Sequence, residues 1–390
     1  MLKIVLYTNT VSPHQLPIAR ELAAMAGAEN FKYVYVDAVD KDHGPLGWKI
    51  DMPVWCIHAE CGCAGEWLEN ADLLLSGLRC FDLFERRGKK GLRSFYMTER
   101  WLKPPVGIAR LLHPRYFGYA RRFCELMSSG AVMGLPIGIH AARDMARLCG
   151  LMHGNLRCLF SAPDVDFERK ACGRIFSRAE REGHIEKIYS FDKMRMWGYF
   201  VEKGRGTRND GEKETQISVL WVGRLLKLKR VDTIIHAVGE LYTGSMCSTQ
   251  PEISLDIYGT GPEENRLKRI AAKYGEAVKF HSAVSIGEVR QLMQEHDVYV
   301  LSSNGYEGWG AVVNEALEEG MRVIGTYEAG ASSTMLPDDC LFHSGDWKRL
   351  QNLLQGCAAM KRCGVLAGQS IDEWRAGMGT KRLLSLAELT

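Results

Sequence analysis

The stretch YEGWGAVVNEALEEG, residues 306–320, decides the fold that we expect for this chain. It follows DVYVLSSN (297–304), an apolar run typical of a buried strand. It then passes through the glycine-bearing turn 308–310 into apolar residues at helical spacing, Ala311, Val312, Val313, Ala316 and Leu317. The predicted order is strand, glycine loop and helix. Such a loop exposes backbone N–H groups at a helix N-terminus, where an anion can bind.

Two carboxylates, Glu307 and Glu315, flank this loop eight positions apart (315 − 307 = 8). A carboxylate repels a phosphate but readily accepts a hydrogen bond from a hydroxyl group. We therefore expect a phosphate to bind the N–H groups of the loop, with both carboxylates binding sugar or ribose hydroxyls beside it.

The rest of the second half alternates strands and helices. Predicted strands cover 217–223, 253–259, 278–284 and 297–303, and predicted helices cover 231–242, 262–274 and 287–296, with Pro262 at the first helical position. This alternation is typical of a parallel α/β sheet, so residues 217–370 are predicted to form a doubly wound, Rossmann-like domain. Ligands of such sheets bind at the carboxyl ends of the strands, where Gly223, Gly259 and Gly308 lie.

The first half shows the same alternation less clearly. Strands are predicted over 3–8, 31–37, 71–77 and 93–99, with a helix over 16–27 that Gly27 closes, whereas 38–70 gives no clear assignment. A length of 390 residues favours two domains. We therefore expect a first Rossmann-like domain over 1–201, a polar linker or hinge over 202–216, and a terminal helix over 371–390.

Composition points to an ordinary globular protein, with 46% hydrophobic and 25% charged residues. No apolar run approaches the ~18 residues of a membrane span, and the start MLKIVLYTN reads as a strand and not a signal peptide.

Twelve cysteines without an export signal predict reduced thiols and a cytoplasmic location. Cys56, Cys61 and Cys63, with His58 and Glu60 among them, are a weak zinc candidate, because the spacing does not match paired CxxC motifs; free thiols are favoured.

The formal net charge of +3 is unevenly distributed. Residues 79–125 hold twelve Lys and Arg against four Asp and Glu (12 − 4 = +8), interleaved with aromatic residues. One interpretation is an ordinary solvated face; the other is a patch for an anionic surface, either phospholipid head groups at the inner face of the cell membrane or an acidic acceptor. Nucleic acid ranks last as a partner, because no nucleic-acid motif accompanies the patch.

Two further loops follow predicted strands of the second domain. Residues 223–230, GRLLKLKR, place four cations after a strand end, and an Arg fork with a Lys ammonium suits a pyrophosphate. Residues 258–262, YGTGP, form a glycine turn between strand and helix that is weak evidence by itself. Together with the loop at 308–310 on the same sheet, these loops favour an anion site over a solvated basic turn.

Four signatures carry a resemblance to a known family: GRLLKLKRVD (223–232), DIYGTGPEENRL (256–267), VKFHSAV (278–284) and EGWGAVVNEALEEG (307–320). In their order and spacing, residues 217–345, about a third of the chain, resemble the donor domain of retaining glycosyltransferases of family 4, which have the GT-B fold. The resemblance implies two Rossmann-like domains facing across a cleft and a nucleotide-sugar donor, a UDP- or GDP-sugar. It also implies no essential metal or other cofactor, and a C-terminal helix that crosses back to the first domain.

Carried over by position, the resemblance assigns roles to individual residues. Arg224 and Lys229 should neutralise the leaving diphosphate, Glu307 should contact the hydroxyls of the transferred sugar, and Glu315 should bind the ribose. The other implied donor-binding residues are Gly223, Gly259, Gly261, His281, Gly308, Trp309, Gly310 and Ala311. Fixed cations and a helix N-terminus can stabilise a departing nucleoside diphosphate in place of a metal ion.

The first domain matches the family less well. Residues 8–17, after the first strand, contain no glycine, whereas family members often carry a glycine-rich loop there. Many members place a histidine after a later strand, where this chain has TERW (98–101), so Glu99 is the candidate at that place. His14 and His140 are the other first-domain candidates, with a structural role favoured for each. This divergence leaves the acceptor undecided between a glycan and a lipid-linked glycan, in the synthesis of bacterial surface polysaccharide such as lipopolysaccharide.

The predicted function is thus a retaining, metal-independent hexosyltransferase. A sugar-nucleotide epimerase on the same fold is an alternative that would need acid and base groups in the first domain. A non-catalytic nucleotide-sugar-binding scaffold subunit is another, and the intact set of Arg224, Lys229, Glu307 and Glu315 argues against it. A phosphorylase is disfavoured, because the chain lacks the cofactor-lysine context that phosphorylases require.

Overall fold

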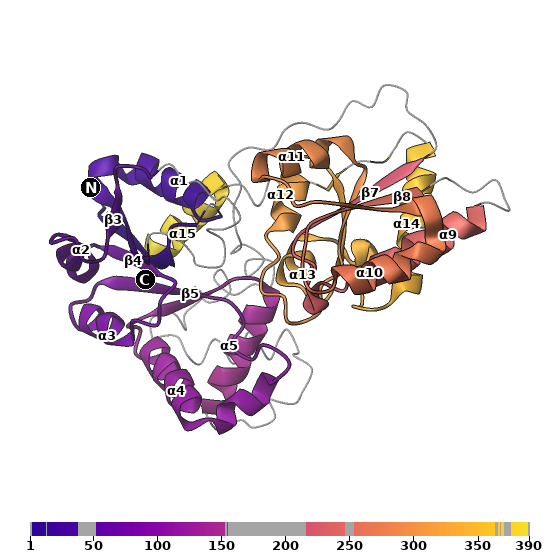
Figure 1. Ribbon diagram of the computed structural model, residues 1–390. Coiled ribbons are helices and arrows are strands. Elements are labelled where there is room, and N and C mark those ends of the chain that lie inside the picture. Colours follow the sequence, from indigo (N-terminus) through magenta and orange to yellow (C-terminus); the bar gives the residue numbers. More distant parts are fainter. Residues whose placement is uncertain are drawn as a thin grey trace. The chain divides into compact units, whose positions relative to one another are not determined.

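The computed structural model describes residues 2–12, 14–37, 52–152, 154, 216–245, 253–362, 366, 368–369 and 376–388. The chain divides into two compact units, one formed by Met1–Glu202 with Glu373–Thr390 and the other by Lys203–Asp372. Each unit contains a parallel sheet with helices packed on it (Figure 1). Apart from Gln216, the predicted linker over 202–216 lies outside the described residues.

The described strands of the first unit form one parallel sheet in the order β3-β2-β1-β4-β5-β6. They are β1 (Ile4–Thr10), β2 (Phe31–Asp37), β3 (Cys56–His58), β4 (Leu73–Ser76), β5 (Arg93–Thr98) and β6 (Met133–Pro136). In register, Ile4 of β1 lies opposite Phe31 of β2 on one side and Leu73 of β4 on the other. The central strands β1 and β4 begin with apolar, buried runs, Ile4–Leu6 and Leu73–Leu75, because helices cover both faces of such a sheet.

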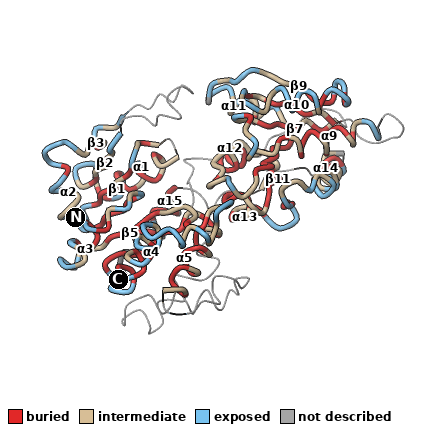
Figure 2. Tube along the Cα trace, turned by 60° about the horizontal axis from the view of Figure 1, so that its bottom comes forward, coloured by how far each residue is buried: buried red, intermediate tan, exposed pale blue. Residues whose placement is uncertain are grey.

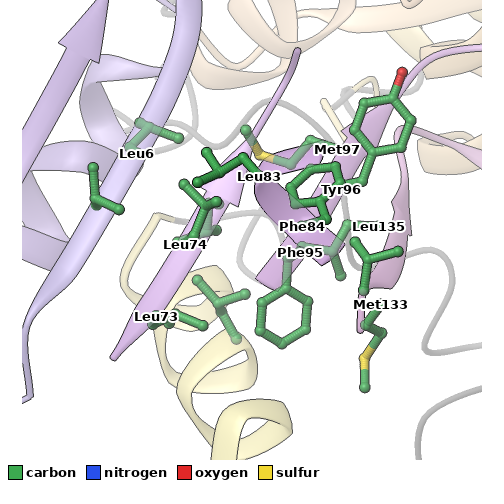
Figure 3. Close-up of a cluster of buried hydrophobic side chains, with 14 of the residues drawn as sticks. Leu6, Leu73, Leu74, Leu83, Phe84, Phe95, Tyr96, Met97, Met133 and Leu135 are labelled. Carbon is green, nitrogen blue, oxygen red and sulfur yellow. The ribbon is translucent and has the colours of Figure 1, made fainter. Parts of the chain in front are cut away.

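The helices of the first unit bury apolar faces against this sheet. They are α1 (Leu16–Ala26), η1 (Ala28–Asn30), α2 (Ala64–Asn70), α3 (Phe81–Lys89), η3 (Gly107–Leu112), α4 (Pro114–Ser128), α5 (Ile139–Met152) and α15 (Ala376–Glu388). Figure 3 shows Leu83 and Phe84 of α3 packed with side chains of β4, β5 and β6. The last helix, α15, lies against α1 (Figure 1), so the C-terminal helix belongs to the first unit.

The described strands of the second unit form a second parallel sheet, in the order β12-β11-β10-β7-β8-β9. They are β7 (Ile217–Val222), β8 (Ile253–Tyr258), β9 (Val278–His281), β10 (Val298–Leu301), β11 (Arg322–Thr326) and β12 (Leu341–Phe342). The intervening helices are η6 (Lys227–Lys229), α9 (Val231–Ser245), α10 (Glu264–Ala271), η7 (Ala272–Ala277), α11 (Ile286–Glu295), α12 (Val312–Glu318), α13 (Gly330–Met335), η8 (Asp338–Cys340) and α14 (Trp347–Arg362). Buried residues follow the strands at the centre of each unit (Figure 2).

The predicted fold class, two Rossmann-like doubly wound domains, is confirmed by these two sheets. One helix start is wrong: α10 begins at Glu264 and not at Pro262. The reason is a turn in which the amide of Glu264 donates to Gly261 O (3.1 Å) and that of Glu263 to Leu225 O (3.1 Å). The short strands β3 and β6 and the helix α2 were not predicted. No helix among the described residues is long and apolar enough to span a membrane.

Candidate functional site

The predicted site residues of the second unit gather at the carboxyl edge of its sheet, where the strand order reverses. β7 and β10 are neighbours there; the sheet continues through β8 and β9 on one side and through β11 and β12 on the other. Ligands of doubly wound sheets bind at such a switch point. The loops that follow Val222 of β7 and Leu301 of β10 therefore frame the candidate site.

Hydrogen bonds join these two loops directly. The amide of Asn304 donates to Leu228 O (2.9 Å), and Ser302 Oγ donates to Lys229 O (2.7 Å). Between them, Lys229 Nζ lies 2.5 Å from Glu307 Oε2, with only 21% and 14% of the two side chains exposed. The structure thus brings together a cation and a carboxylate that lie 78 positions apart in sequence. Each holds the other in place at the switch point, because a largely buried charge is stable only when it is paired.

The loop after Glu307 is anchored by the buried side chain of Trp309. Only 2% of this residue is exposed, and its Nε1 donates to Asn314 Oδ1 of α12 (2.7 Å). The Trp309 side chain is therefore used for packing, and donor binding through the main chain near Trp309 stays a prediction. The amides that begin α13, at Gly330 and Ala331, donate to the carbonyl groups of Gly308 (3.3 Å) and Trp309 (2.7 Å).

This arrangement turns carbonyl groups toward α13 and leaves neighbouring amides available. Within the described part of the chain, the amides of Gly308, Gly310 and Ala311 donate to no protein acceptor. Gly310 has φ 88°, and a Cβ there would lie 2.9 Å from Leu301 Cδ2, so the turn requires glycine. The loop thus offers main-chain donors near the Lys229–Glu307 pair, and their binding of a phosphate stays a prediction.

Glu315 lies in the first turn of α12. Part of its surface stays accessible, yet protein surrounds it closely enough that burial raises the pKa of its carboxyl group, with Glu318 adding to the rise and Arg290 opposing it. Arg290 of α11 also forms ion pairs with Glu318 and Glu319, both at 2.8 Å. This fork fixes α12, and with it Glu315, against α11.

The glycines after β7 and β8 have a structural explanation. The loops run side by side, with the Gly223 amide donating to Tyr258 O (3.0 Å). A Cβ at Gly259 would lie 1.9 Å from Gly223 O, and one at Gly261 would lie 2.5 Å from Leu225 O. Both positions also have a positive φ, 148° and 158°. These glycines permit the close approach of two loops, and this packing accounts for them without any ligand contact.

The basic turn after β7 contains an unusual backbone. Arg224 is exposed, whereas Arg230 adopts the left-handed conformation (φ 47°, ψ 41°) directly after Lys229. Arg230 Nε and Arg266 Nη2 each lie 3.2 Å from the carboxylate of Asp232. Burial favours the neutral form of Asp232, but these two guanidinium groups outweigh it and hold its pKa below the usual value. A left-handed non-glycine residue is costly and often marks a functional turn.

His281, predicted to bind the donor, is held by residues that the sequence reasoning missed. Its ring stacks on Tyr258 with centroids 4.2 Å apart, and its Nε2 lies 2.6 Å from Asp256 Oδ1. The other oxygen of Asp256 lies 3.4 Å from His296 Nε2. Burial would raise the pKa of Asp256, but hydrogen bonds from His296 and His281 outweigh it and lower the pKa. An Asp within the apolar strand β8 was the available signal for this cluster.

The first-domain candidates follow three different strands of the first sheet. His14 comes after β1, and its amide lies 3.3 Å from Ser12 Oγ. Glu99 comes directly after β5, and its carbonyl group accepts from Thr98 Oγ1 (2.9 Å). His140 lies in the first turn of α5, which follows β6. All three therefore belong to the carboxyl edge of that parallel sheet, and their functional roles remain predictions.

The basic segment 79–125 is less uniformly basic at the surface than its composition suggests. Arg87 is fully buried, donates to Ser94 Oγ and to the carbonyl groups of Leu68, Ala71 and Arg93, and has its pKa lowered to about 10 by burial. Six other cations of the segment form ion pairs: Arg86, Lys89, Lys90, Arg100, Arg121 and Arg122. The segment therefore presents fewer unpaired cations to the predicted anionic partner than its composition suggests.

Cys56, Cys61 and Cys63 were the weak zinc candidate of the sequence. No three His, Cys, Asp or Glu side chains of the described residues are grouped so that they could hold a metal ion. Cys56, Cys61 and Cys63 are free thiols.

Comparisons with known proteins concentrate on the second unit. Residues 206–357 match the model of the family described as Glycosyl transferases group 1. Over 121 residues the chain is 30% identical to the UDP-N-acetylglucosamine–peptide N-acetylglucosaminyltransferase GtfA subunit of Streptococcus pneumoniae, which is 31% of this chain and 23% of that protein. It is 26% identical over 160 residues to a GDP-mannose-dependent monoacylated alpha-(1-6)-phosphatidylinositol monomannoside mannosyltransferase of Corynebacterium glutamicum, which is 39% of this chain and 41% of that protein. The matched stretches thus span less than half of either relative.

Solved structures are similar over the whole chain. Anabaena Alr3699/HepE in complex with UDP has a TM-score of 0.60 at 12% identity, with 100% of both chains covered. The lipopolysaccharide outer core galactosyltransferase WaaB has a TM-score of 0.56 at 13% identity, with 98% of both chains covered. Identities this low establish the fold alone. The sequence match makes residues 206–357, most of which belong to the second unit, similar to domains of the glycosyl transferases group 1 family.

Proposed function

We propose that this protein is a retaining glycosyltransferase that moves a sugar from a UDP- or GDP-sugar to a glycan or lipid-linked acceptor. The observation that supports it best is the Lys229–Glu307 pair at the switch point, 2.5 Å apart, beside main-chain amides that have no acceptor in the described part of the protein. A cation and free amides suit a phosphate, and a carboxylate suits sugar hydroxyls. The group 1 match of residues 206–357 supports the donor class.

The proposed roles follow from these positions. Lys229 and the exposed Arg224 neutralise the diphosphate, Glu307 accepts from hydroxyls of the transferred sugar, and Glu315 accepts from the ribose. In the front-face displacement that the family resemblance implies, the bond from the anomeric carbon to the phosphate oxygen breaks and a bond to the acceptor oxygen forms on the same face. The acceptor proton passes to the leaving phosphate. Fixed cations stabilise the charge that develops on that phosphate, so the proposal requires no metal ion.

The test is sugar transfer by Lys229→Met and Glu307→Gln variants. Loss of one preorganised charge-stabilising group costs about 10²–10³-fold in rate, and we expect losses of that size in both variants. Lys348→Met and Glu276→Gln, at exposed positions of the same unit, are matched controls and should keep full activity. Full activity in both site variants would overturn the assignment.

The choice of donor is tested by thermal shift with UDP, GDP and their sugar conjugates, with and without a metal chelator. A ligand at a hundredfold its Kd stabilises a protein by about 2.7 kcal/mol. A shift with one base alone identifies the donor class, and a shift that disappears with chelator contradicts metal independence. Turnover of the donor without any acceptor would support the epimerase alternative. Binding without turnover in the presence of candidate acceptors would support the scaffold alternative.

We further propose that the first unit contacts an anionic lipid surface through residues 103–117. Three apolar side chains are exposed there, Val106 (48%), Leu112 (85%) and Phe117 (39%). Val106 and Leu112 lie at the two ends of η3, and Phe117 lies in α4, which packs against η3. Lys103, Arg110 and Arg115 lie in the same stretch and have no acidic partner among the described residues; Arg110 and Arg115 lie over the rings of Tyr116 and Tyr119. Apolar tips beside unpaired cations are typical of segments that bind the interface of anionic membranes.

Co-sedimentation with vesicles that contain anionic lipid tests this surface. The combined change Arg110→Gln and Arg115→Gln should abolish a salt-sensitive association. A combined change of Arg86→Gln and Lys89→Gln, two cations that are already paired with Glu69 and Glu85, removes the same charge and should have little effect. Equal losses in both double variants, or no binding at low salt, would contradict the proposal.

A further inference from the structure

Two exposed thiols face each other in the first unit, outside the proposed sugar-transfer site. Cys61 and Cys63 lie in the turn between β3 and α2, and their Sγ atoms are 3.5 Å apart. The turn is built by backbone hydrogen bonds, from the Cys61 amide to His58 O and from the Ala64 amide to Cys61 O, both 2.9 Å. These bonds hold the two thiols on one side of a short, ordered turn.

The surroundings of the pair distinguish it from the other cysteines of the described residues. Burial raises the pKa of Cys56 to about 12 and that of Cys80 to about 11. The pKa of Cys61 is instead lowered, because the backbone N–H and the thiol of Cys63 both donate to its sulfur. The thiolate is the reactive form of cysteine, so Cys61 is the favoured nucleophile of this group.

We propose that Cys61 and Cys63 form a redox modification site, an exposed dithiol that a low-molecular-weight disulfide such as oxidised glutathione converts into an intrachain disulfide. The two sulfur atoms must approach from 3.5 Å to the ~2.05 Å of an S–S bond. Gly62 lies between them, and a Cβ there would meet nothing within 4 Å, so the turn has room to adjust. Tetrahedral zinc needs about three or four protein ligands, and no such group occurs among the described residues.

The disulfide between Cys61 and Cys63 forms in two thiol–disulfide exchange steps. The Cys61 thiolate attacks one sulfur of the oxidised disulfide, which forms a mixed disulfide and releases one thiolate. Cys63 then loses its proton and attacks the Cys61 sulfur, and the second small thiol leaves. The protein is oxidised by two electrons, and the low-molecular-weight disulfide is reduced to two thiols. Because the new ring spans three residues and lies at the surface, we expect it to be strained and easily reduced.

The experiment treats the full-length reduced protein with oxidised glutathione, blocks the remaining thiols under denaturing conditions, and maps the digested peptides by mass spectrometry. In the wild type, the peptide that contains both residues should lose two hydrogens and gain no glutathione. Cys63→Ser should stop at a glutathione adduct on Cys61. Cys61→Ser should stop at a glutathione adduct on Cys63, because no second thiol is left to close the ring. Addition of a reductant should restore two thiols in the wild type.

Cys80→Ser is the matched control, because that half-buried thiol lies on another element and should not affect closure. Glutathione adducts on both Cys61 and Cys63 without ring closure would overturn the proposal, as would closure only in denaturant. Circular dichroism of each variant shows that the fold is retained. Sugar transfer is not the readout, so failure of this inference is independent of the proposed function.

Discussion

Replacing Gly259 with alanine tests the argument that two loops of the site must approach each other closely. The new Cβ would lie 1.9 Å from Gly223 O, whereas real Cβ contacts essentially never fall below 3.0 Å. The loops must therefore separate by at least 1.1 Å (3.0 − 1.9 = 1.1). The obstructing atom is backbone, held by the hydrogen bond from the Gly223 amide to Tyr258 O, so no side-chain rotation relieves the clash.

Two costs add in this variant. Overpacking costs about 1–3 kcal/mol, and a residue with a Cβ held at a φ of 148° costs about 1–3 kcal/mol more. We expect Gly259→Ala to lower the free energy of unfolding of the second unit by about 3 kcal/mol, in the lower half of the summed range of about 2–6 kcal/mol. A change of this size corresponds to about 100-fold faster exchange of the amides that open only by global unfolding.

Hydrogen–deuterium exchange of peptides from β7 and β8 measures this effect in the full-length protein. Gly356→Ala is the matched control, because Gly356 lies within α14 and a Cβ there would meet nothing within 4 Å. The same chemical change should stabilise that helix by about 0.5–1 kcal/mol. If both variants shift exchange in β7 and β8 equally, or if Gly259→Ala leaves it within about threefold of the wild type, the close-approach argument is refuted.

Three further predictions concern single side chains of the second unit. Asp256→Asn should remove a pH-dependent contribution to the free energy of unfolding. Because the pKa of Asp256 is lowered, its carboxylate contributes fully above its ordinary pKa of 3.8. Because the pKa of His296 is raised, the Asp256–His296 ion pair contributes fully below the ordinary histidine pKa of 6.5. The wild-type advantage in denaturant midpoint should thus be greatest between these values and decline on either side; a constant difference would contradict it. Arg230→Gly should be about 1 kcal/mol more stable than Arg230→Ala, because only alanine retains the left-handed strain; equal midpoints would refute this. Ser285→Ala removes the capping box of α11 and should cost about 1 kcal/mol, with faster exchange confined at first to α11; unchanged exchange there would show that the cap contributes little.

Strands of the second unit were predictable because their signal is local. β7, β8 and β10 are largely apolar runs that are followed by glycine or serine, and burial on both faces of a parallel sheet produces such runs. β3 has three half-buried residues at the edge of its sheet, and β6 is a four-residue strand that ends in Pro136, so neither carries a distinct period. The start of α10 was misplaced because a contact with the β7 loop, and not local preference, sets it.

For the candidate site, the sequence indicated which residue types belong there, and the structure decided how they are paired. Motif spacing and family resemblance selected Lys229 and Glu307, but their adjacency depends on β7 and β10 being neighbours in the sheet. The cluster of Asp256, His281 and His296 was missed for the same reason, since its members lie 25 and 40 positions apart.

The sequence by itself determined the strands and helices of the second unit from β7 to α12, the class of its fold and the presence of cations and carboxylates after its strands. Tertiary structure alone decided that Trp309 is buried and that Gly259 serves loop packing. It also decided that Arg87 lies inside the first unit. The physical reason is that hydrophobic periodicity and turn preference act over a few neighbouring residues. Burial and charge pairing depend instead on which distant strands and loops the packed sheet brings into contact.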